Sequence, residues 1–439
     1  MALTGVENLA RLPELKNKLL WTFLLLAVYR VGVHVPVPGV DAAALADFFE
    51  TAKNTLFGLF DMFSGGALGN VSIFSLGIMP YISASIIIQL LSVVSPELAR
   101  MQKEDGAAGK KKMTQYTRYG TVLISVVQGF GIAVGLESMA SPTGAPVVLD
   151  PGWGFKLMTM TTLCTGTVFL MWLGEQITGK GIGNGISLII FAGIVAGFPR
   201  ATINTFQLLS AGELSLFVLL LLVALMVAVL GVIIFVERGQ RRIPIQYAKR
   251  MVGRKMYGGQ TTHLPLRINT AGVIPPIFAS SILLFPATIA NFSQVAWLSD
   301  IAHYFSPQNV VYNLLFVAMI VFFCYFYTAI IFDPKDIAEN LRKQGGFIPG
   351  IRPGAKTREY IDRVLTRITL WGAIYISAVC VLPMMLIQHF NVPFYFGGTS
   401  LLIVVGVAMD FMGQIESYLI SRQYEGLMAK GRIKGRNSF

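Results

Sequence analysis

Ten apolar stretches alternate with polar connections along this chain of 439 residues. Each stretch is long enough to cross the hydrocarbon core of a bilayer as a helix, which takes about 20 apolar residues. The stretches lie at 19–37, 71–94, 119–136, 157–174, 181–198, 215–236, 271–290, 309–332, 368–388 and 397–415. The pattern predicts an all-α polytopic membrane protein with ten transmembrane helices.

The distribution of Lys and Arg predicts how these helices are oriented. The two ends and every second connection carry 31 of these residues, and the remaining connections carry two, while Arg30 lies inside a stretch and Lys156 at the edge of one. Basic connections stay in the cytoplasm, so both termini are predicted to be cytoplasmic. The most basic connections are two loops at 237–269 and 333–366.

The stretch from Leu59 to Val94 contains a short apolar piece that stops at Ser64-Gly65-Gly66, directly before a segment that can span. Glycine favours such a break because it tolerates backbone angles that other residues avoid. Broken helices are tolerated at membrane depth only inside protein or beside a water-filled cavity. We therefore expect this piece of backbone to lie in a cavity, next to the helix that lines it.

An internal repeat links the two halves of the chain. Residues 77–87 match residues 272–282 at six of eleven positions, an offset of 195, and residues around Gly185 match those around Gly398 at an offset of 213. Short apolar matches also arise by chance, but both matches join segments that are five apart. An odd shift reverses the direction of crossing, which predicts two inverted five-helix halves, 1–205 and 206–439, with the functional path between them.

Composition narrows the classes of function. The chain is 54% hydrophobic and 13% charged, whereas soluble proteins carry about 25% charged residues. Met1 to Lys18 is polar, so we expect no cleavable signal peptide. The three cysteines lie in apolar segments and the four histidines are scattered, which favours neither a disulfide nor a metal site. No catalytic or nucleotide-binding motif is present, so we expect no enzyme activity and no cofactor.

Few ionisable residues fall inside the predicted spans, mainly Arg30 and Asp410, with Glu175 at an end. We expect Arg30 and Asp410 to be structural, for example hydrogen-bonded to backbone. A secondary transporter or small-solute channel would need a polar site near the midplane, which the sequence does not offer. A membrane insertase or scaffold without a pore is a third class. The repeated segments instead offer branched aliphatic residues, which close a pore by excluding water and ions.

Several long motifs resemble the SecY family, the channel-forming subunits of the bacterial Sec protein translocon. They are FSGGAL (63–68), GIMPYISASIIIQLL (77–91), QYTRYG (115–120), GIGNGISLIIFAGIVAG (181–197), ERGQRRIP (237–244), GFIPGIRPG (346–354) and PFYFGGTSLLIVV (393–405). The resemblance covers Leu12 to Arg436 and implies a clamshell of two inverted halves around an hourglass pore.

The resemblance also implies roles for individual residues. A half-helix at about 62–71 corresponds to the plug of the channel, which includes Met62, Phe63, Ser64, Gly65, Gly66, Ala67 and Leu68. The pore ring corresponds to Ile78, Ile82, Ile190, Ile277 and Ile403. The lateral gate lies between segments two and seven and includes Ser83, Ser85, Ile86, Gln89, Ser280 and Ser281. Arg352, Arg241 and Arg242 are the basic residues expected to bind partners.

The partners follow from the same resemblance. We expect the small membrane subunits SecE and SecG, the motor ATPase SecA, and the ribosome, whose RNA phosphates the basic loops would meet. Signal peptides, nascent polypeptides and membrane lipids complete the set. The protein is expected in the cytoplasmic (inner) membrane, moving unfolded polypeptides across it or releasing them sideways into lipid, with energy from the cytoplasmic partner.

Overall fold

The computed structural model of the chain describes residues 13–41, 61, 64–103, 106–138, 147–212, 215–247, 250–252, 255–257, 261–292, 309–390 and 398–433. Each of the ten predicted segments contains a helix. These helices are α2 (Pro13–Gly32), α5 (Met79–Val94), α7 (Gly106–Ser138), α8 (Trp153–Lys180), α9 (Gly185–Ser210), α10 (Leu216–Arg238), α11 (Ile274–Phe292), α13 (Val310–Ile331), α15 (Ala355–Phe390) and α16 (Gly398–Ile433). Over the described ranges, seven helices are long and apolar enough to span a membrane, and α5 is a shorter apolar helix.

The second predicted span is shorter than expected. We predicted a helix over 71–94, but α5 begins only at Met79, and residues 65–78 form consecutive turns apart from a single bend and bridge residue. The predicted half-helix over 62–71 is also wrong for its described part, because Ser64 is the last helical residue there. Gly65 and Gly66 adopt positive φ angles of 71° and 85°, which end a right-handed helix. Met62 and Phe63 lie outside the described residues.

The repeat found in the sequence reappears in where the helices begin. The offset of 195 carries Met79 at the start of α5 onto Ile274 at the start of α11. The glycine two residues before each start has a positive φ, 56° at Gly77 and 64° at Gly272. The offset of 213 likewise carries the start of α9 at Gly185 onto the start of α16 at Gly398.

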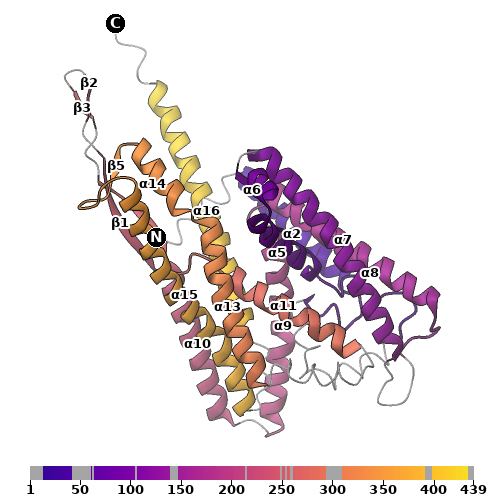
Figure 1. Cartoon of the computed structure of the whole chain (residues 1–439). Coiled ribbons are helices and arrows are strands. Elements are labelled where there is room, and N and C mark those ends of the chain that lie inside the picture. Colours follow the sequence, from indigo (N-terminus) through magenta and orange to yellow (C-terminus); the bar gives the residue numbers. More distant parts are fainter. Residues whose placement is uncertain are drawn as a thin grey trace. The chain divides into compact units, whose positions relative to one another are not determined.

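The chain forms two compact units, and we describe each by itself. The first contains 1–202, 284–306 and 406–439; the second contains 203–283 and 307–405. In the first unit, α7 lies along α8, and α5 and the short helix α6 (Pro96–Lys103) pack against α7 (Figure 1).

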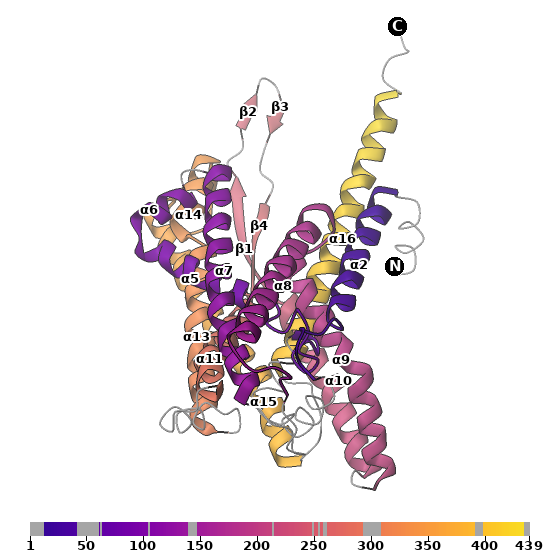
Figure 2. The same cartoon turned by 90° about the vertical axis from the view of Figure 1, so that its right-hand side faces the viewer.

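The second unit contains the strands of the described chain, and they tie the two basic loops together. In the loop at 237–269, β1 (Gln240–Tyr247) pairs antiparallel with β4 (Thr261–Arg267). Beyond them, β2 (Arg250–Val252) pairs with β3 (Lys255–Tyr257) (Figure 2). The other edge of β1 pairs with β5 (Gly346–Phe347) of the loop at 333–366, which gives the sheet order β4-β1-β5.

A small core joins this sheet to α14 (Pro334–Lys343) and to the beginning of α15. It is built from the buried side chains Ile243, Ile245, Leu266, Leu341, Ile348, Ile361 and Leu365. From Arg242 to Gln246, side chains along β1 alternate between exposed and buried, as expected for a strand with one face on a core. The two loops that look separate in the sequence therefore fold as one body.

Candidate functional site

The turns between Ser64 and Ile78 form a closed loop, which we call the loop segment. Its two ends touch, because a Cβ placed on Gly77 would lie 3.6 Å from the Cα of Ser64. The hydroxyl of Ser75 ties the middle together by donating to the carbonyls of Ala67 (3.0 Å) and Ser72 (2.6 Å). Such compact loops, packed by their own groups, are frequently functional.

The end of α2 holds the start of the loop segment through two hydrogen bonds. The phenol of Tyr29 donates to the carbonyl of Ser64 over 3.0 Å, and Nη1 of Arg30 donates to the carbonyl of Gly65 over 2.8 Å. Tyr29 is also stacked on Phe74 of the loop segment, with ring centroids 6.1 Å apart. The backbone hydrogen bond expected for Arg30 is therefore confirmed.

Two glycines on neighbouring helices let the loop segment approach closely. A Cβ placed on Gly65 would lie only 2.7 Å from the Cα of Gly193 on α9. A Cβ placed on Gly166 of α8 would lie 1.9 Å from the carbonyl oxygen of Ile73. Side chains at these positions would push the loop segment away, so glycine is required by close packing.

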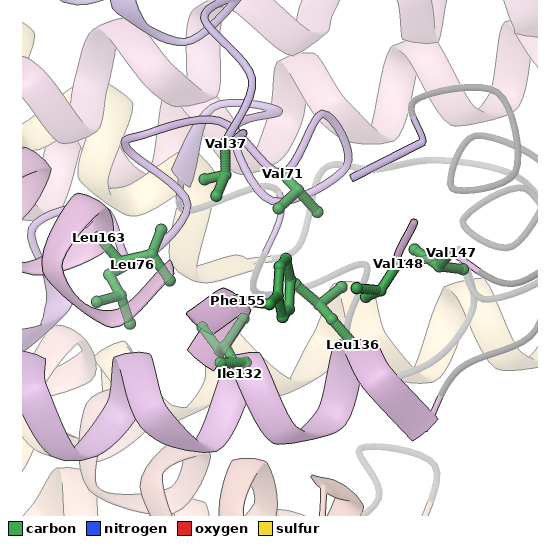
Figure 3. Close-up of a cluster of buried hydrophobic side chains, with 10 residues drawn as sticks. Val37, Val71, Leu76, Ile132, Leu136, Val147, Val148, Phe155 and Leu163 are labelled. Atoms are coloured by element: carbon green, nitrogen blue, oxygen red, sulfur yellow. The ribbon is translucent and has the colours of Figure 1, made fainter. Parts of the chain in front are cut away.

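Residues 71–76 of the loop segment pack into the core of the first unit. The amide of Ile73 donates to the carbonyl of Val35 (3.0 Å), and the amide of Val37 donates to the carbonyl of Val71 (2.8 Å). Beside these bonds lies an apolar cluster contributed by the loop segment, α7 and α8 (Figure 3). Its members include Val37, Val71, Leu76, Ile132, Leu136, Phe155 and Leu163.

Three of the predicted ring residues lie next to the loop segment in the first unit. Ile78 ends the loop segment, and Ile82 follows one helical turn later on α5, where the amide of Ile82 donates to the carbonyl of Ile78 (3.1 Å). Ile190 precedes Gly193 by one turn on α9, and Gly193 touches Gly65. All three isoleucines are buried.

The other two predicted ring residues belong to the second unit. Ile277 lies near the start of α11, and Ile403 lies near the start of α16. Both are buried, and Ile403 has no exposed surface at all.

The predicted gate residues are polar groups that mostly bond within their own helices. On α11, the hydroxyls of Ser280 and Ser281 donate to the carbonyl of Ile277 over 2.9 and 2.7 Å. On α5, Nε2 of Gln89 donates to Oγ of Ser85 over 3.3 Å, while Oε1 of Gln89 is buried without a hydrogen-bond partner. The same helix carries Ser83, which is half-buried, and Ile86, which is buried.

The predicted partner-binding arginines lie on the folded body of the second unit. Arg241 and Arg242 are exposed on β1. Arg352 is exposed in the turn between Gly350 and Gly354, whose φ angles are 81° and 103°. The hydroxyl of Thr357 donates to the carbonyl of Arg352 over 3.0 Å and fixes this turn.

Reading the sequence missed several contacts that the structure shows. Tyr29 was not singled out, although it bonds the loop segment together with its neighbour Arg30. Arg118 was not singled out either. It forms a bidentate ion pair with Glu175, with hydrogen bonds of 2.9 and 2.6 Å, and this pair joins α7 to α8. The strands of the first basic loop had a usable signal, the alternation in QRRIPIQY.

Within the described part of the chain, no group of three or more His, Cys, Asp or Glu side chains is arranged to hold a metal ion. The site is instead built mainly from backbone carbonyls, small residues and branched aliphatic side chains, and its polar groups Tyr29 and Arg30 are bonded to the carbonyls of Ser64 and Gly65. Such a site has the means to close an opening, and its chemistry offers little for binding a particular solute.

Solved structures of known proteins share the fold of this chain. The fold matches "The structure of a protein conducting channel" with a TM-score of 0.65 and 18% identity, covering 93% of each chain. It also matches a structure of Sec61 in a canine ribosome–channel complex, with a TM-score of 0.62, 18% identity and 93% of each chain covered.

Sequence relatives are much closer. The protein translocase subunit SecY of Pseudomonas aeruginosa is 53% identical over 100% of this chain and 98% of its own length. The SecY of Escherichia coli K12 is 54% identical over 97% of this chain and 96% of its own length. The SecY family profile matches residues 72–412. The chain therefore belongs to the SecY family of protein translocase subunits.

Proposed function

We infer that this chain is the protein-conducting channel of a Sec translocase. In this function, unfolded secretory polypeptides cross the membrane through the chain, and membrane proteins leave it sideways into lipid. The family is one of channel subunits, and the energy is supplied by a separate partner. The finer assignments below are our proposals.

The loop segment serves as the plug, and the five isoleucines serve as the pore ring. A collar of branched aliphatic side chains excludes water and ions at rest, yet makes no specific contact with a substrate. It therefore suits a moving chain of any sequence. A plug domain that maintains a membrane seal is described for the SecY protein of one structural neighbour, which has a TM-score of 0.63 and 20% identity and covers 93% of each chain.

The two repeated helices α5 and α11 serve as the sides of the lateral gate. A signal peptide or transmembrane segment would part them by offering its own apolar surface. All the exchanged contacts are apolar, so the exchange costs little free energy. Gln89 and the serines of these helices would supply the few polar contacts along the gate.

The folded body of the two basic loops serves as the docking site for the driving partner. The partners we propose are SecA and the ribosome at this face, and SecE and SecG within the membrane. Two structural neighbours come from ribosome-bound channels, of canine and yeast origin. We place the protein in the cytoplasmic membrane with both termini in the cytoplasm, because the Lys and Arg residues lie overwhelmingly on that side.

The contact between the loop segment and the ring residues of the first unit carries this proposal. The loop segment ends on Ile78 and touches α9 one turn from Ile190. A secondary transporter would instead leave polar groups open to its solute at this position, whereas Tyr29 and Arg30 are bonded to the backbone carbonyls of Ser64 and Gly65. An insertase without a pore would not need a plug beside a hydrophobic pore ring.

Replacing Ile82, Ile277 and Ile403 together with glycine tests the ring. We expect vesicles that contain the resting variant to leak ions, because glycine leaves the collar too wide to exclude water. The measurement is the ion conductance of the reconstituted translocase without substrate. A variant that inserts normally and keeps the membrane tight would refute the ring.

A further inference from the structure

We propose that Tyr29 and Arg30 form a latch that holds the loop segment in its resting position. The inference rests on the proposed role of the loop segment as the plug, and it assigns the residues that set when the plug leaves. It also gives a role to Arg30, a charged residue within a predicted span that the channel function by itself leaves unexplained.

The latch sits where the loop segment most needs hydrogen-bond donors. A helix ends at Ser64, and the positive φ angles of Gly65 and Gly66 turn the backbone away. The last carbonyls of a helix have no partner within that helix. Carbonyls that lack a partner are costly at membrane depth. Tyr29 and Arg30 supply donors to two consecutive carbonyls at this point.

The two donors are positioned by packing. Tyr29 is 2% exposed and stacks on Phe74, which itself lies where a Cβ on Gly32 would be. The loop segment is therefore held by the same short stretch of α2 at two points, Ser64–Gly65 by hydrogen bonds and Phe74 by ring contact. A shift of the loop segment breaks all of these contacts together.

The charge of Arg30 makes the latch sensitive to water. A guanidinium group stays protonated in proteins, so it cannot lower the cost of losing its acceptor by releasing a proton. At rest, the half-buried guanidinium has the carbonyl of Gly65 as its acceptor, and this favours the resting position. When a substrate enters and water follows, water replaces the carbonyl. The loop segment then leaves at a lower cost.

Tyr29→Phe and Arg30→Gln, singly and together, test the latch. Phe keeps the ring stacking and removes only the hydroxyl donor, while Gln removes the charge and keeps a shorter donor. We expect the resting ion conductance of the reconstituted translocase to rise about tenfold in the double variant and less in each single variant. Arg30→Lys, which keeps the charge, should lie closer to the parent protein.

A second measurement reports on the loop segment directly. Ala67 has no exposed surface at rest, so the Ala67→Cys variant should react slowly with a water-soluble maleimide. The background carries Cys164→Ala, Cys324→Ala and Cys380→Ala. We expect the latch variants to speed this labelling at an unchanged thermal unfolding midpoint. Tyr312→Phe, which removes a buried hydroxyl from α13 in the second unit, is the matched control and should change neither readout.

The outcomes separate the latch from the channel itself. If the glycine variant of the ring conducts while the latch variants label and conduct as the parent does, the latch is wrong and the channel stands. If neither the ring variant nor the latch variants conduct, the proposed channel is wrong as well. In a third outcome, the conductance of the latch variants rises only in proportion to the fall in their thermal unfolding midpoint. In that case Tyr29 and Arg30 only stabilise the fold, and the latch is refuted.

Discussion

Gly193 on α9 makes a close backbone contact with the loop segment. A Cβ placed there would lie 3.1 Å from the phenol oxygen of Tyr29 and 3.3 Å from the Cα of Gly65. Both distances are shorter than ordinary van der Waals contact, so any larger residue must displace either the loop segment or the tyrosine. Four residues later on the same helix, a Cβ placed on Gly197 would meet no atom within 4 Å. The two glycines therefore differ in what a side chain would touch.

Gly193→Val should loosen the loop segment, with Gly197→Val as the matched control. Overpacking of a close contact typically costs about 1–3 kcal/mol. We expect this cost to fall on the resting position, which raises the resting ion conductance of the translocase by roughly tenfold or more. The test compares the resting ion conductance of the two variants, each reconstituted in vesicles of the same composition. Equal conductance in the two would show that the contact with Gly193 does not hold the loop segment.

At the scale of elements, the sheet of the second unit makes a single platform from two loops far apart in sequence. The pairing of β1 with β5 brings Gln246 opposite Phe347, across about a hundred residues of chain. Ile348 is buried in the shared core and lies four residues before Arg352. The exposed tip with Arg352 is therefore anchored at both sides, by the core before it and by α15 after it. A stiff tip loses little backbone entropy when its arginine binds a carboxylate or phosphate, and the planar guanidinium loses less side-chain entropy for each hydrogen bond formed.

Arg352→Glu should slow polypeptide translocation driven by SecA about tenfold or more, since it reverses the charge at the anchored tip. Arg100→Glu, an equal charge reversal at an exposed position on α6 outside the two basic loops, is the control and should retain most of the rate. The protease resistance of the sheet should be the same in both variants, because neither side chain is part of the core. Parent-like translocation by the first variant would remove Arg352 from the docking site.

At the scale of the whole molecule, α16 near the end of the chain contacts α2 near its beginning. The later part of α16 belongs to the same compact unit as α2. Ile415 packs with Leu15 and Ile182, and Oε1 of Gln414 accepts from the amide of Gly183 over 2.9 Å. The hydroxyl of Tyr418 donates to Glu14 over 2.9 Å. The end of the second half thus fastens onto the first half.

Co-expression of the chain as two pieces tests this fastening. The predicted boundary at 205/206 falls inside α9, so the cut belongs in the turn at Gly212, where φ is 76°. We expect pieces 1–212 and 213–439 to purify together in mild detergent. Removing 406–439 from the second piece should weaken this association at least tenfold. Undiminished association of the shortened piece would show that α16 is not the fastening.

The sequence by itself determined the fold class, the ten helices and the repeat. Apolar runs of spanning length have few alternatives to a helix in a bilayer, because every backbone polar group must be bonded within the segment. The long motifs also determined the family, and with it the channel function. The structure adds that the repeat extends to where helices begin, because α5 and α11 start at corresponding residues, as do α9 and α16.

Only the tertiary structure decided what holds the loop segment and what joins the basic loops. The partners of Ser64 and Gly65 lie 35 residues away on α2, and Gly193 is more distant still. Local pattern carries no information about such contacts, because hydrogen bonds to a carbonyl and close approach to a glycine leave no periodic trace. For the same reason the short pairing of β1 with β5 was invisible in sequence. The break at Ser64-Gly65-Gly66 was recognisable, but the closed shape of the loop segment depends on neighbours that only folding brings to it.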